Sequence, residues 1–284
     1  MIERDKMEIA ENVMTKRVIT CPPTGSLSEV QKLMIKHNIT RVVIVNADRK
    51  PIGIATEEDI IDFLVADKSR RGIEEIKIEE LMKKKLVTAK PNTAISDIAK
   101  TMTEKKISSV VIVDDEGKLD GIVTKTDVTA CCGTKGGLYK VQDFMTPKPV
   151  TVTPSQPIFM VASLMADHKI SRIIVVDKEG KPIGIITAAD MTMVSKLLRP
   201  AKVLKEKKPL VVRGLIALPK SVYLLTAGDI MTSDPISIAK QHDLADAAKL
   251  MTRHGISGLP ITDDEKLVGI ITKSDIVRAV ASKI

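Results

Sequence analysis

The sequence predicts an α/β (α+β) protein made of four copies of one β-α-β-β-α repeat. Two observations predict this fold. Short apolar runs typical of buried strands alternate with segments of helical spacing. The same succession then recurs four times along the 284 residues, and each copy closes with a G-x-x-T-x-x-D element. One copy of this length buries too little apolar surface to be stable alone, so we expect the copies to pair.

The first half of the first repeat predicts a strand followed by a helix. Residues 18–20 form a short run of β-branched side chains, which is typical of a strand. Residues 27–36 place Leu27, Val30, Leu33 and Met34 on one face of a helix. Either Ser26 or Ser28 is suited to cap that helix.

The second half predicts a strand hairpin and a closing helix. Residues 42–45 form a continuous apolar run, as expected of a buried strand. The polar segment 46–50 is a turn, residues 52–55 are the next strand, and residues 57–65 are a second helix. The other repeats show the same order.

The repeats share a nearly constant internal length. Each opens on a methionine, at Met14, Met82, Met145 and Met231, and successive methionines lie 68, 63 and 86 residues apart. The glycines of the closing element lie 68, 63 and 85 residues apart, at Gly53, Gly121, Gly184 and Gly269. We therefore divide the chain into repeats at 8–66, 78–130, 141–197 and 227–284. A glycine-containing linker covers 131–140, and a basic insertion covers 198–226.

Composition limits the classes of function. No apolar stretch is long enough to span a membrane, and the first residues lack an apolar signal core, so we expect a cytoplasmic protein without membrane association. Three cysteines suit neither a disulfide framework nor a zinc site. No catalytic or metal-binding set has suitable spacing, and the repeats and linkers fill the chain, so we expect no enzyme activity.

The net charge of +8 is concentrated in the basic insertion, which holds seven cations and one acid. This segment keeps a nucleic-acid-linked regulator open as an alternative function. Aromatic residues make up only 2% of the chain, and no helix-turn-helix pattern is present, so nucleic acid is the less favoured partner.

Three motifs resemble a known family. Each repeat combines an M-T-x-x-P-I/V-T-like opening, an I-S/T-x centre and the G-I-x-T-x-x-D close. These units resemble CBS domains, named after cystathionine β-synthase, and their pairing resembles two Bateman modules with pseudo-two-fold symmetry. The fourfold organisation resembles the γ subunit of AMP-activated protein kinase. The resemblance implies a non-catalytic regulator linked to energy sensing that binds AMP, ADP or ATP, with S-adenosylmethionine as an alternative and no obligatory cofactor. It further implies an unidentified protein effector and allows a homodimer.

The T-x-x-D element has two interpretations. A threonine at a strand-to-helix junction with an acid three residues later is a capping box, although that box favours the longer Glu or Gln. A short carboxylate beside a helix N-terminus is also suited to accept ribose hydroxyls, while the N-terminus attracts an anionic group. The resemblance places the ribose contacts at Asp59, Asp127, Asp190, Asp275, Thr56, Thr124, Thr187 and Thr272.

The resemblance also implies base and phosphate contacts, with base contacts of one repeat joining the ribose aspartate of its partner. Lys83 replaces the opening threonine of the second repeat. Phosphate contacts are expected at Arg41 and Arg172 in the I-S-R centre, and at Lys125 and Lys273 after the motif threonine, although all four are also explained as exposed cations. The implied base contacts are Thr15, Thr20, Ile54, Thr88, Ile122, Thr146, Thr151, Ile185, Thr232, Ser237 and Ile270.

Overall fold

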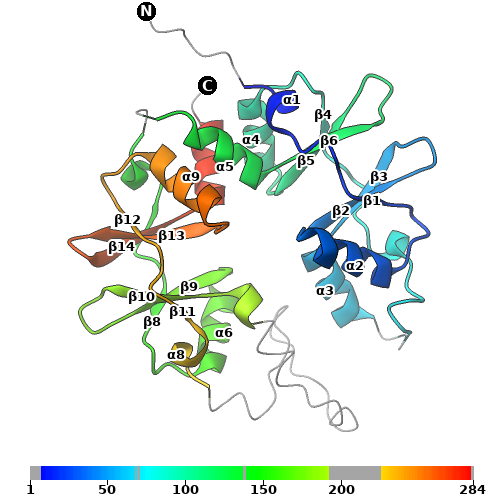
Figure 1. The fold of residues 1–284 in the computed structure, drawn as a ribbon. Helices are drawn as coiled ribbons and strands as arrows, with labels where there is room; N and C mark the ends of the chain where they lie inside the picture. The colour runs from blue at the N-terminus through cyan, green and yellow to red at the C-terminus, as the bar shows by residue number, and fades with distance from the viewer. Residues whose placement is uncertain (1–7, 68, 70, 137–138, 192–224, 283–284) are drawn as a thin grey trace, which may run out of the picture. The chain divides into compact units, whose positions relative to one another are not determined.

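The computed structural model describes residues 8–67, 69, 71–136, 139–191 and 225–282 (Figure 1). The chain divides into two compact units. Unit 1 comprises residues 1–135 and 276–284, and unit 2 comprises residues 136–275. The helix that closes the fourth repeat, α10 (Lys273–Ala281), is therefore divided between the two units.

Unit 1 contains the first two repeats. The first holds β1 (Thr20–Cys21), α2 (Leu27–His37), β2 (Arg41–Val45), β3 (Pro51–Thr56) and α3 (Glu57–Ala66). The second holds β4 (Thr88–Ala89), α4 (Ile95–Glu104), β5 (Ser109–Val113), β6 (Leu119–Thr124) and α5 (Lys125–Gly133). A short helix or 3-10 turn precedes each, α1 (Ala10–Val13) before the first and η1 (Ile78–Glu80) before the second.

Unit 2 repeats this order with longer sheets. Its first repeat holds η2 (Val141–Asp143), β7 (Thr146–Pro147), β8 (Thr151–Val152), α6 (Ile158–Asp167), β9 (Arg172–Val176) and β10 (Pro182–Thr187). Its second holds α8 (Ala227–Ile230), β11 (Thr232–Ser233), β12 (Ile238–Ala239), α9 (Leu244–Arg253), β13 (Gly258–Asp263), β14 (Lys266–Thr272) and the start of α10.

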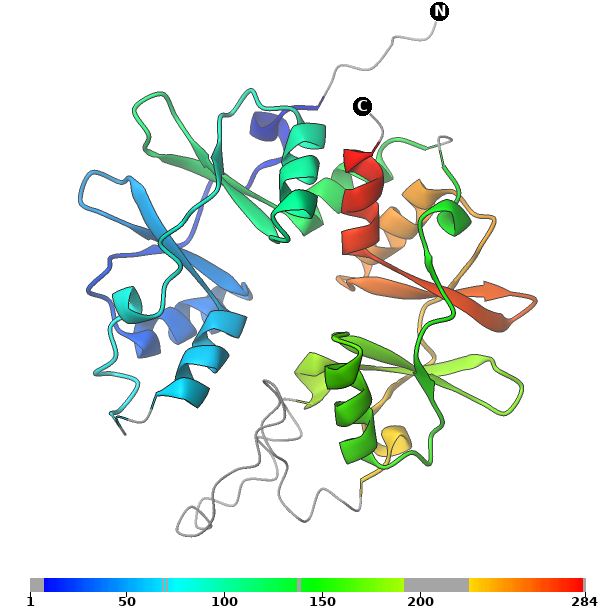
Figure 2. The ribbon, with the colours of Figure 1, turned by 180° about the vertical axis from the view of Figure 1, so that it is seen from behind.

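Each repeat has a small mixed sheet with helices on one face, as Figures 1 and 2 show for α2 and α3 on the β1–β2–β3 sheet. The opening strand runs parallel to the next, and the following two strands form an antiparallel hairpin. The other sheets have the orders β4-β5-β6, β11-β10-β9-β8 and β12-β13-β14-β7. This α/β architecture confirms the predicted fold class.

The periodicity of α2 explains its position. Leu27, Val30 and Met34 are buried against the strands of the first repeat, as their spacing predicts. Ser26, and not Ser28, caps the helix. Its hydroxyl accepts the Glu29 N–H, while the Glu29 carboxylate accepts the Ser26 N–H over 2.7 Å. The helix ends one residue later than predicted, at His37.

The leading segment of each repeat packs on its partner repeat. Ala10 and Met14, which precede β1, are buried with Ile98 and Met102 of the second repeat. In the same way, Ile78 before β4 belongs to the core of the first repeat. The same exchange occurs in unit 2: Ala227 joins the core of the first repeat there, and the Val141 N–H donates to His242 O of the second. The repeats are thus continuous in sequence but exchanged in space.

This exchange places each opening methionine against a glycine of the partner repeat. In unit 1, Met14 covers Gly121 of the second repeat, and Met82 covers Gly53 of the first. In unit 2, the equivalent pairs are Met231 on Gly184 and Met145 on Gly269. A β-carbon at any of the four glycines would lie 2.4–2.6 Å from the methionine sulfur, so these positions require the absence of a side chain.

Two of the predicted boundaries require correction. The linker expected over 131–140 begins later, because α5 continues through Gly133 and unit 1 ends at Lys135. Most of the basic insertion predicted at 198–226 lies outside the described residues, and Thr226 is already the N-cap of α8. In the part of the chain that is described, no helix is long and apolar enough to cross a membrane.

Candidate functional site

Every T-x-x-D element forms a capping box at the start of a helix. The main-chain N–H of each threonine donates to Oδ2 of its aspartate over 2.7–2.9 Å. The threonine hydroxyl donates to the same oxygen over 2.6–2.7 Å. An aspartate is therefore long enough for this box, although the box favours the longer Glu or Gln.

The cap uses only one oxygen of each carboxylate. Within the described part of the chain, Oδ1 of Asp127 and Oδ1 of Asp190 have no hydrogen-bond or ion-pair partner. Both side chains are half-buried. The capping and ligand interpretations are thus compatible: Oδ2 holds the helix start, and Oδ1 is available to accept hydroxyls from a ligand.

The exchanged opening segments lie beside these carboxylates. Thr15 and Ile122 exchange two main-chain hydrogen bonds, of 3.0 and 3.2 Å, which adds an edge to the sheet that ends at Asp127. Lys83 makes the same exchange with Ile54, over 2.8 and 3.1 Å. In unit 2, Thr232 pairs with Ile185 and Thr146 pairs with Ile270. Every expected opening residue is therefore in register with the base-pocket isoleucine of the partner repeat.

The predicted base contacts form one row across each sheet. In the first repeat, Thr20 pairs with Val43, Val43 with Ile54, and Ile54 with Lys83. Residues directly opposite on neighbouring strands share a face of the sheet. Two corresponding rows run from Thr88 through Val111 and Ile122 to Thr15, and from Thr151 through Ile174 and Ile185 to Thr232. In the fourth sheet the row runs from Pro260 through Ile270 to Thr146, and the predicted contact Ser237 immediately precedes β12.

The centre of this face is apolar and shared by the two repeats of unit 1. Val43 and Ile54 of the first repeat pack with Val111 and Ile122 of the second in one cluster. This cluster joins the two sheets. Each of the four capped aspartates, with its threonine and the row of its own repeat, is a candidate site, and the name cleft is used for the surroundings of that aspartate.

Both predicted arginines reach across to the partner repeat. Arg41 Nη1 donates to Ser108 O over 2.9 Å and to Ser108 Oγ over 3.0 Å, and Nη2 donates to Thr40 Oγ1 over 3.2 Å. Burial lowers the pKa of the Arg41 guanidinium, whereas the negative charge of Asp127, followed by that of Glu57, raises it. Arg41 is therefore held near the cleft of the second repeat.

Arg172 has the equivalent position in unit 2. Its Nη2 donates to Ser257 Oγ over 3.0 Å, and a β-carbon at Gly258 would lie 2.2 Å from Nη1. Burial lowers the pKa of this guanidinium and the charge of Asp275 raises it. The glycine at the centre of the fourth repeat, which lacks a cation, thus provides space for the arginine of the third.

The arginines predicted in the first and third repeats and the lysines predicted in the second and fourth consequently gather at the same two clefts. Lys125 and Lys273 are the first helical residues after the capping threonines of the Asp127 and Asp275 clefts, which Arg41 and Arg172 also approach. The Asp59 cleft has Glu57 at the position of these lysines. The Asp190 cleft has the uncharged Ala188 there.

The Asp59 cleft differs further from the others. Lys83 Nζ lies 2.7 Å from Asp59 Oδ1, and the side chain of Asp59 is only 6% exposed. Burial raises the pKa of Asp59, but hydrogen bonds from Lys83 and Thr56 outweigh burial and leave that pKa below its ordinary value. Both oxygens of this carboxylate thus have partners within the chain.

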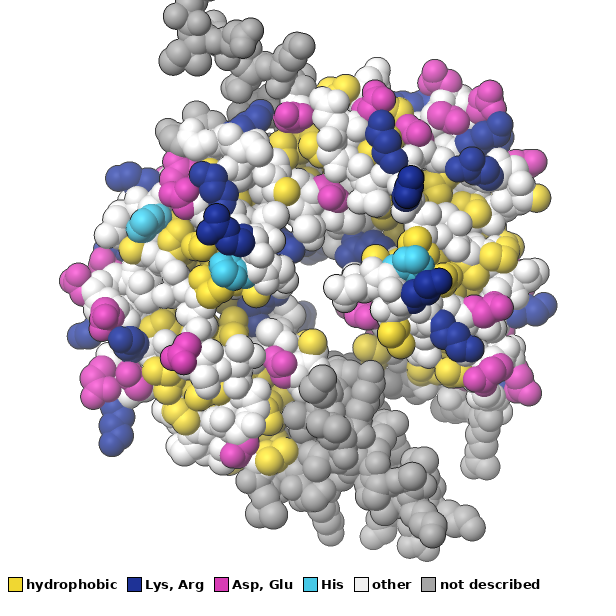
Figure 3. Space-filling model, in the orientation of Figure 1, with side chains coloured by type: hydrophobic (Ala, Val, Ile, Leu, Met, Phe, Trp, Pro, Cys, Tyr) yellow, Lys and Arg dark blue, Asp and Glu magenta, His cyan; other side chains and the backbone are white. Residues whose placement is uncertain are grey.

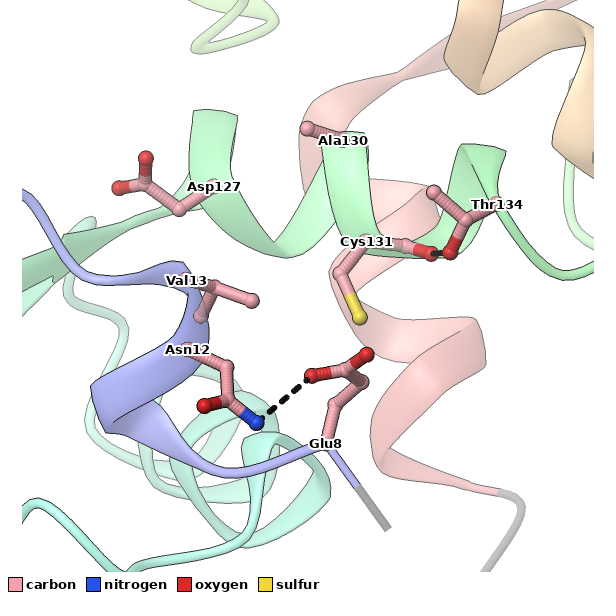
Figure 4. A pocket seen from close by; sticks show the side chains of 7 residues that line it. All are labelled: Glu8, Asn12, Val13, Asp127, Ala130, Cys131 and Thr134. Atoms are coloured by element: carbon pink, nitrogen blue, oxygen red, sulfur yellow. Dashed lines mark hydrogen bonds between the residues drawn. The ribbon is translucent and has the colours of Figure 1, made fainter. Parts of the chain in front are cut away.

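A cavity of about 400 Å³ opens beside Asp127 (Figure 4). Its remaining lining comes from α1, the residues before it, and the outer turns of α5. Figure 4 shows Asp127 at one end and the Asn12 side chain donating to Glu8 at the other. Burial raises the pKa of the Cys131 thiol in this cavity, and the charge of Glu8 raises it further. The sequence analysis missed all lining residues except Asp127, namely Glu8, Asn12, Val13, Ala130, Cys131 and Thr134.

These features are those of a known family. A family model described as the CBS domain matches residues 10–66, 78–132, 141–196 and 227–282. The chain belongs to the CBS-domain family. Its four CBS domains are arranged as two pairs, one in each unit, with the leading segments exchanged within the pair.

One relative of similar length matches nearly the whole of this chain. MJ1225, an uncharacterised protein of Methanocaldococcus jannaschii, is 29% identical over 287 residues, which cover 96% of this chain and 97% of MJ1225. Its crystal structure superposes with a TM-score of 0.71 at 25% identity, over 96% of this chain and 99% of that one, and it is described as a candidate archaeal homologue of the γ subunit of AMP-activated protein kinase.

Two further matches support the fold. MJ1404 of the same organism is 27% identical over 282 residues, 96% of this chain but 62% of MJ1404. A conserved protein of Pyrococcus horikoshii has a TM-score of 0.67 at 20% identity, over 96% of this chain and all of that one, and shows the same fold.

Neither the charges on the face shown in Figure 3 nor metal-ligating groups among the described residues point to a second site. In the face shown in Figure 3, Lys and Arg side chains alternate with Asp and Glu over each unit, without a continuous basic surface. No group of three His, Cys, Asp or Glu side chains suited to a metal ion occurs among the residues that the structure describes. The basic segment behind the nucleic-acid hypothesis lies almost wholly outside them.

Proposed function

We propose that this protein is a non-catalytic regulator that binds adenosine-containing ligands, namely AMP, ADP or ATP, in the clefts between paired CBS domains. One observation carries the proposal: the cap leaves Oδ1 of Asp127 available beside the Thr15–Ile122 edge and near the Arg41 guanidinium. A carboxylate oxygen, an apolar row and a desolvated cation match a ribose, a base and a phosphate in turn.

The charges favour a phosphate-bearing ligand at two clefts. Charge-assisted hydrogen bonds to a phosphate are the strong ones, and a guanidinium already fixed by the serine of the partner repeat loses little further freedom on binding. The helix N-termini after Thr124 and Thr272 add a favourable partial charge. The Asp127 and Asp275 clefts are therefore the proposed nucleotide sites, and the Asp190 cleft, without these cations, is proposed to favour the nucleoside part.

The cavity beside Asp127 supports ligand binding in unit 1. Its volume of about 400 Å³ falls within the range of about 300–1,000 Å³ typical of small-molecule sites. It shares Asp127 with the proposed site but is lined by none of the predicted base or phosphate contacts.

Calorimetry with AMP, ADP, ATP and S-adenosylmethionine tests the proposal. We expect saturable binding of at least one adenine nucleotide. Asp127→Asn should reduce the number of sites by one, because the asparagine amide oxygen can still accept the Thr124 N–H at the cap, whereas the NH₂ group that replaces the other oxygen cannot accept a ribose hydroxyl. Glu8→Gln is a matched control that removes one negative charge from the cavity and leaves the ribose contact intact. Absence of binding to every ligand would refute the proposal.

A further inference from the structure

The four clefts are not equivalent, and the difference lies in one side chain. The residue paired with the base-pocket isoleucine is Thr15, Thr146 or Thr232 in three clefts and Lys83 in the fourth. A threonine at this position is too short to reach the aspartate, whereas the lysine places Nζ 2.7 Å from Asp59 Oδ1. The lysine thus occupies the oxygen that a ribose would need.

We propose that Lys83 is a resident ligand of the Asp59 cleft and closes this cleft to adenosine-containing molecules. The inference rests on the proposed function of the other clefts. In the Asp59 carboxylate, Oδ2 accepts the Thr56 N–H and hydroxyl, and Oδ1 accepts the Lys83 ammonium, so the oxygen that has no partner at Asp127 already has a charged partner here.

The contact is held at both ends. The main chain of Lys83 is fixed by two hydrogen bonds to Ile54, so only the side chain has to be ordered to form the ion pair. The hydrogen bond to Asp59 raises the pKa of Lys83. The charges of Glu58 and Asp62, which lie on α3 with Asp59, raise that pKa further. A ligand entering this cleft would have to leave a carboxylate that is 6% exposed without its ammonium partner.

The rest of the cleft offers a phosphate no compensation. Glu57 stands where the Asp127 cleft has Lys125. Arg41, the phosphate-contact candidate of the first repeat, is directed to Ser108 of the second repeat. A phosphate would therefore meet negative charge at the helix start, and the residue that could attract it, Lys83, is already neutralised by Asp59.

The test counts sites in the full chain by calorimetry, with adenosine as the probe because it lacks a phosphate and is not repelled by Glu57. Lys83→Thr, which introduces the residue of the other clefts, is expected to add one site. Asp59→Asn should leave the wild-type count unchanged, because this cleft is closed, but should remove the added site in the Lys83→Thr background. The matched substitution Thr15→Lys should close the Asp127 cleft and remove one site.

Several results would overturn the inference. A lower site count in Asp59→Asn alone, with adenosine or with AMP, would show that the wild-type cleft is open. A Lys83→Thr variant that gains no site, while the wild type binds at the other clefts, would show that Lys83 is not the barrier. If no variant binds any adenosine ligand, the proposed function fails, and this inference fails with it.

The ion pair is also testable without a ligand. The side chains of Lys83, Lys84 and Lys85 are all exposed, but the ion pair with Asp59 raises the pKa of Lys83, so under limiting acylating reagent peptide mapping should show Lys83 labelled several-fold more slowly than the other two. Asp59→Asn should remove this difference. Because the N-cap residue Thr56 is unchanged and an asparagine amide oxygen can still accept the Thr56 N–H, α3 should remain intact in this variant, as circular dichroism would show. Equal labelling of the three lysines in the wild type would contradict the contact and overturn the inference.

Discussion

Gly121→Ala tests the contact that joins each opening segment to its partner repeat. A β-carbon at residue 121 would lie 2.4 Å from Met14 Sδ and 2.8 Å from Met14 Cγ. Met14 is 8% exposed and packs with Ala10, Ile98 and Met102, so the methionine has little room to move away.

The expected cost is obtained from two opposing effects. Overpacking a buried site destabilises a protein by about 1–3 kcal/mol. Replacing glycine by alanine also reduces the freedom of the unfolded chain, which stabilises by about 0.4–1 kcal/mol. We therefore expect Gly121→Ala to lower the free energy of unfolding by about 1–2 kcal/mol. We also expect it to weaken adenosine binding at Asp127, because Thr15 is the residue after Met14.

Urea unfolding followed by circular dichroism is the suitable assay, since the chain has no Trp and two Tyr. Gly136→Ala is the matched control: nothing lies within 4 Å of its added β-carbon, so this change should be neutral or slightly stabilising. In a Met14→Ala background, Gly121→Ala should lose most of its cost. The reasoning is refuted if Gly121→Ala is no more destabilising than Gly136→Ala, or if its cost is the same without the methionine side chain.

Three further predictions concern charge. Arg41→Ala should weaken AMP binding at the Asp127 cleft by about 10–100-fold, as expected for a lost charge-assisted hydrogen bond of about 1.5–3 kcal/mol, and should leave adenosine binding nearly unchanged; an equal loss for both ligands in calorimetry would contradict a phosphate contact. Alkylation of Cys131 should require a higher pH than a free thiol because its pKa is raised, and Glu8→Gln should lower that pH, which the pH profile of labelling measures. The folded-state pKa of Asp59 is depressed, so its contribution to stability is present above the ordinary aspartate value of about 3.9 and is lost as the pH falls through the folded value. Urea midpoints should accordingly fall more steeply below about pH 4 in the wild type than in Asp59→Asn, and parallel profiles would show that the ion pair with Lys83 adds no stability.

The sequence predicted the elements of a repeat well because their signals are local. The spacing of Leu27, Val30 and Met34 defines one face of a helix whatever lies against it, and the structure places this helix within one residue of its predicted end. The apolar run at 42–45 indicated the buried strand β2 for the same reason. The prediction of the strand before α2 was less accurate. This strand was predicted at 18–20 and is formed by Thr20–Cys21, because a two-residue edge strand has almost no pattern of its own.

Exchange of the leading segments could not be predicted from the pattern of the residues, because no local signal distinguishes packing on the same repeat from packing on the partner. Met14 opens the first repeat, but the core in which it is buried is that of the second repeat. The cavity residues Glu8 and Cys131 were missed for this reason. They are 123 positions apart in the sequence and line one cavity only because α1 lies against α5.

The T-x-x-D element shows a different limit. Sequence spacing gives the cap and the ligand contact as alternatives, because it identifies a carboxylate but not its two oxygens. The structure assigns Oδ2 to the cap in all four elements. At Asp59 it assigns Oδ1 to Lys83, a partner 24 positions away that the spacing of the motif does not include.

Exchange between the repeats also explains how the proposed regulator could respond to a ligand. At the proposed Asp127 site, the ribose acceptor and Ile122 come from the second repeat, whereas Thr15 and Arg41 come from the first. A ligand bound there contacts both repeats, so its binding free energy stabilises their association and not either repeat alone. At a concentration 100 times the dissociation constant this linkage is worth about 2.7 kcal/mol, enough to shift a balance between two arrangements of the pair roughly 100-fold. With the Asp59 cleft closed by Lys83, unit 1 would respond to one ligand and not two, so its response to ligand concentration would follow a single binding curve.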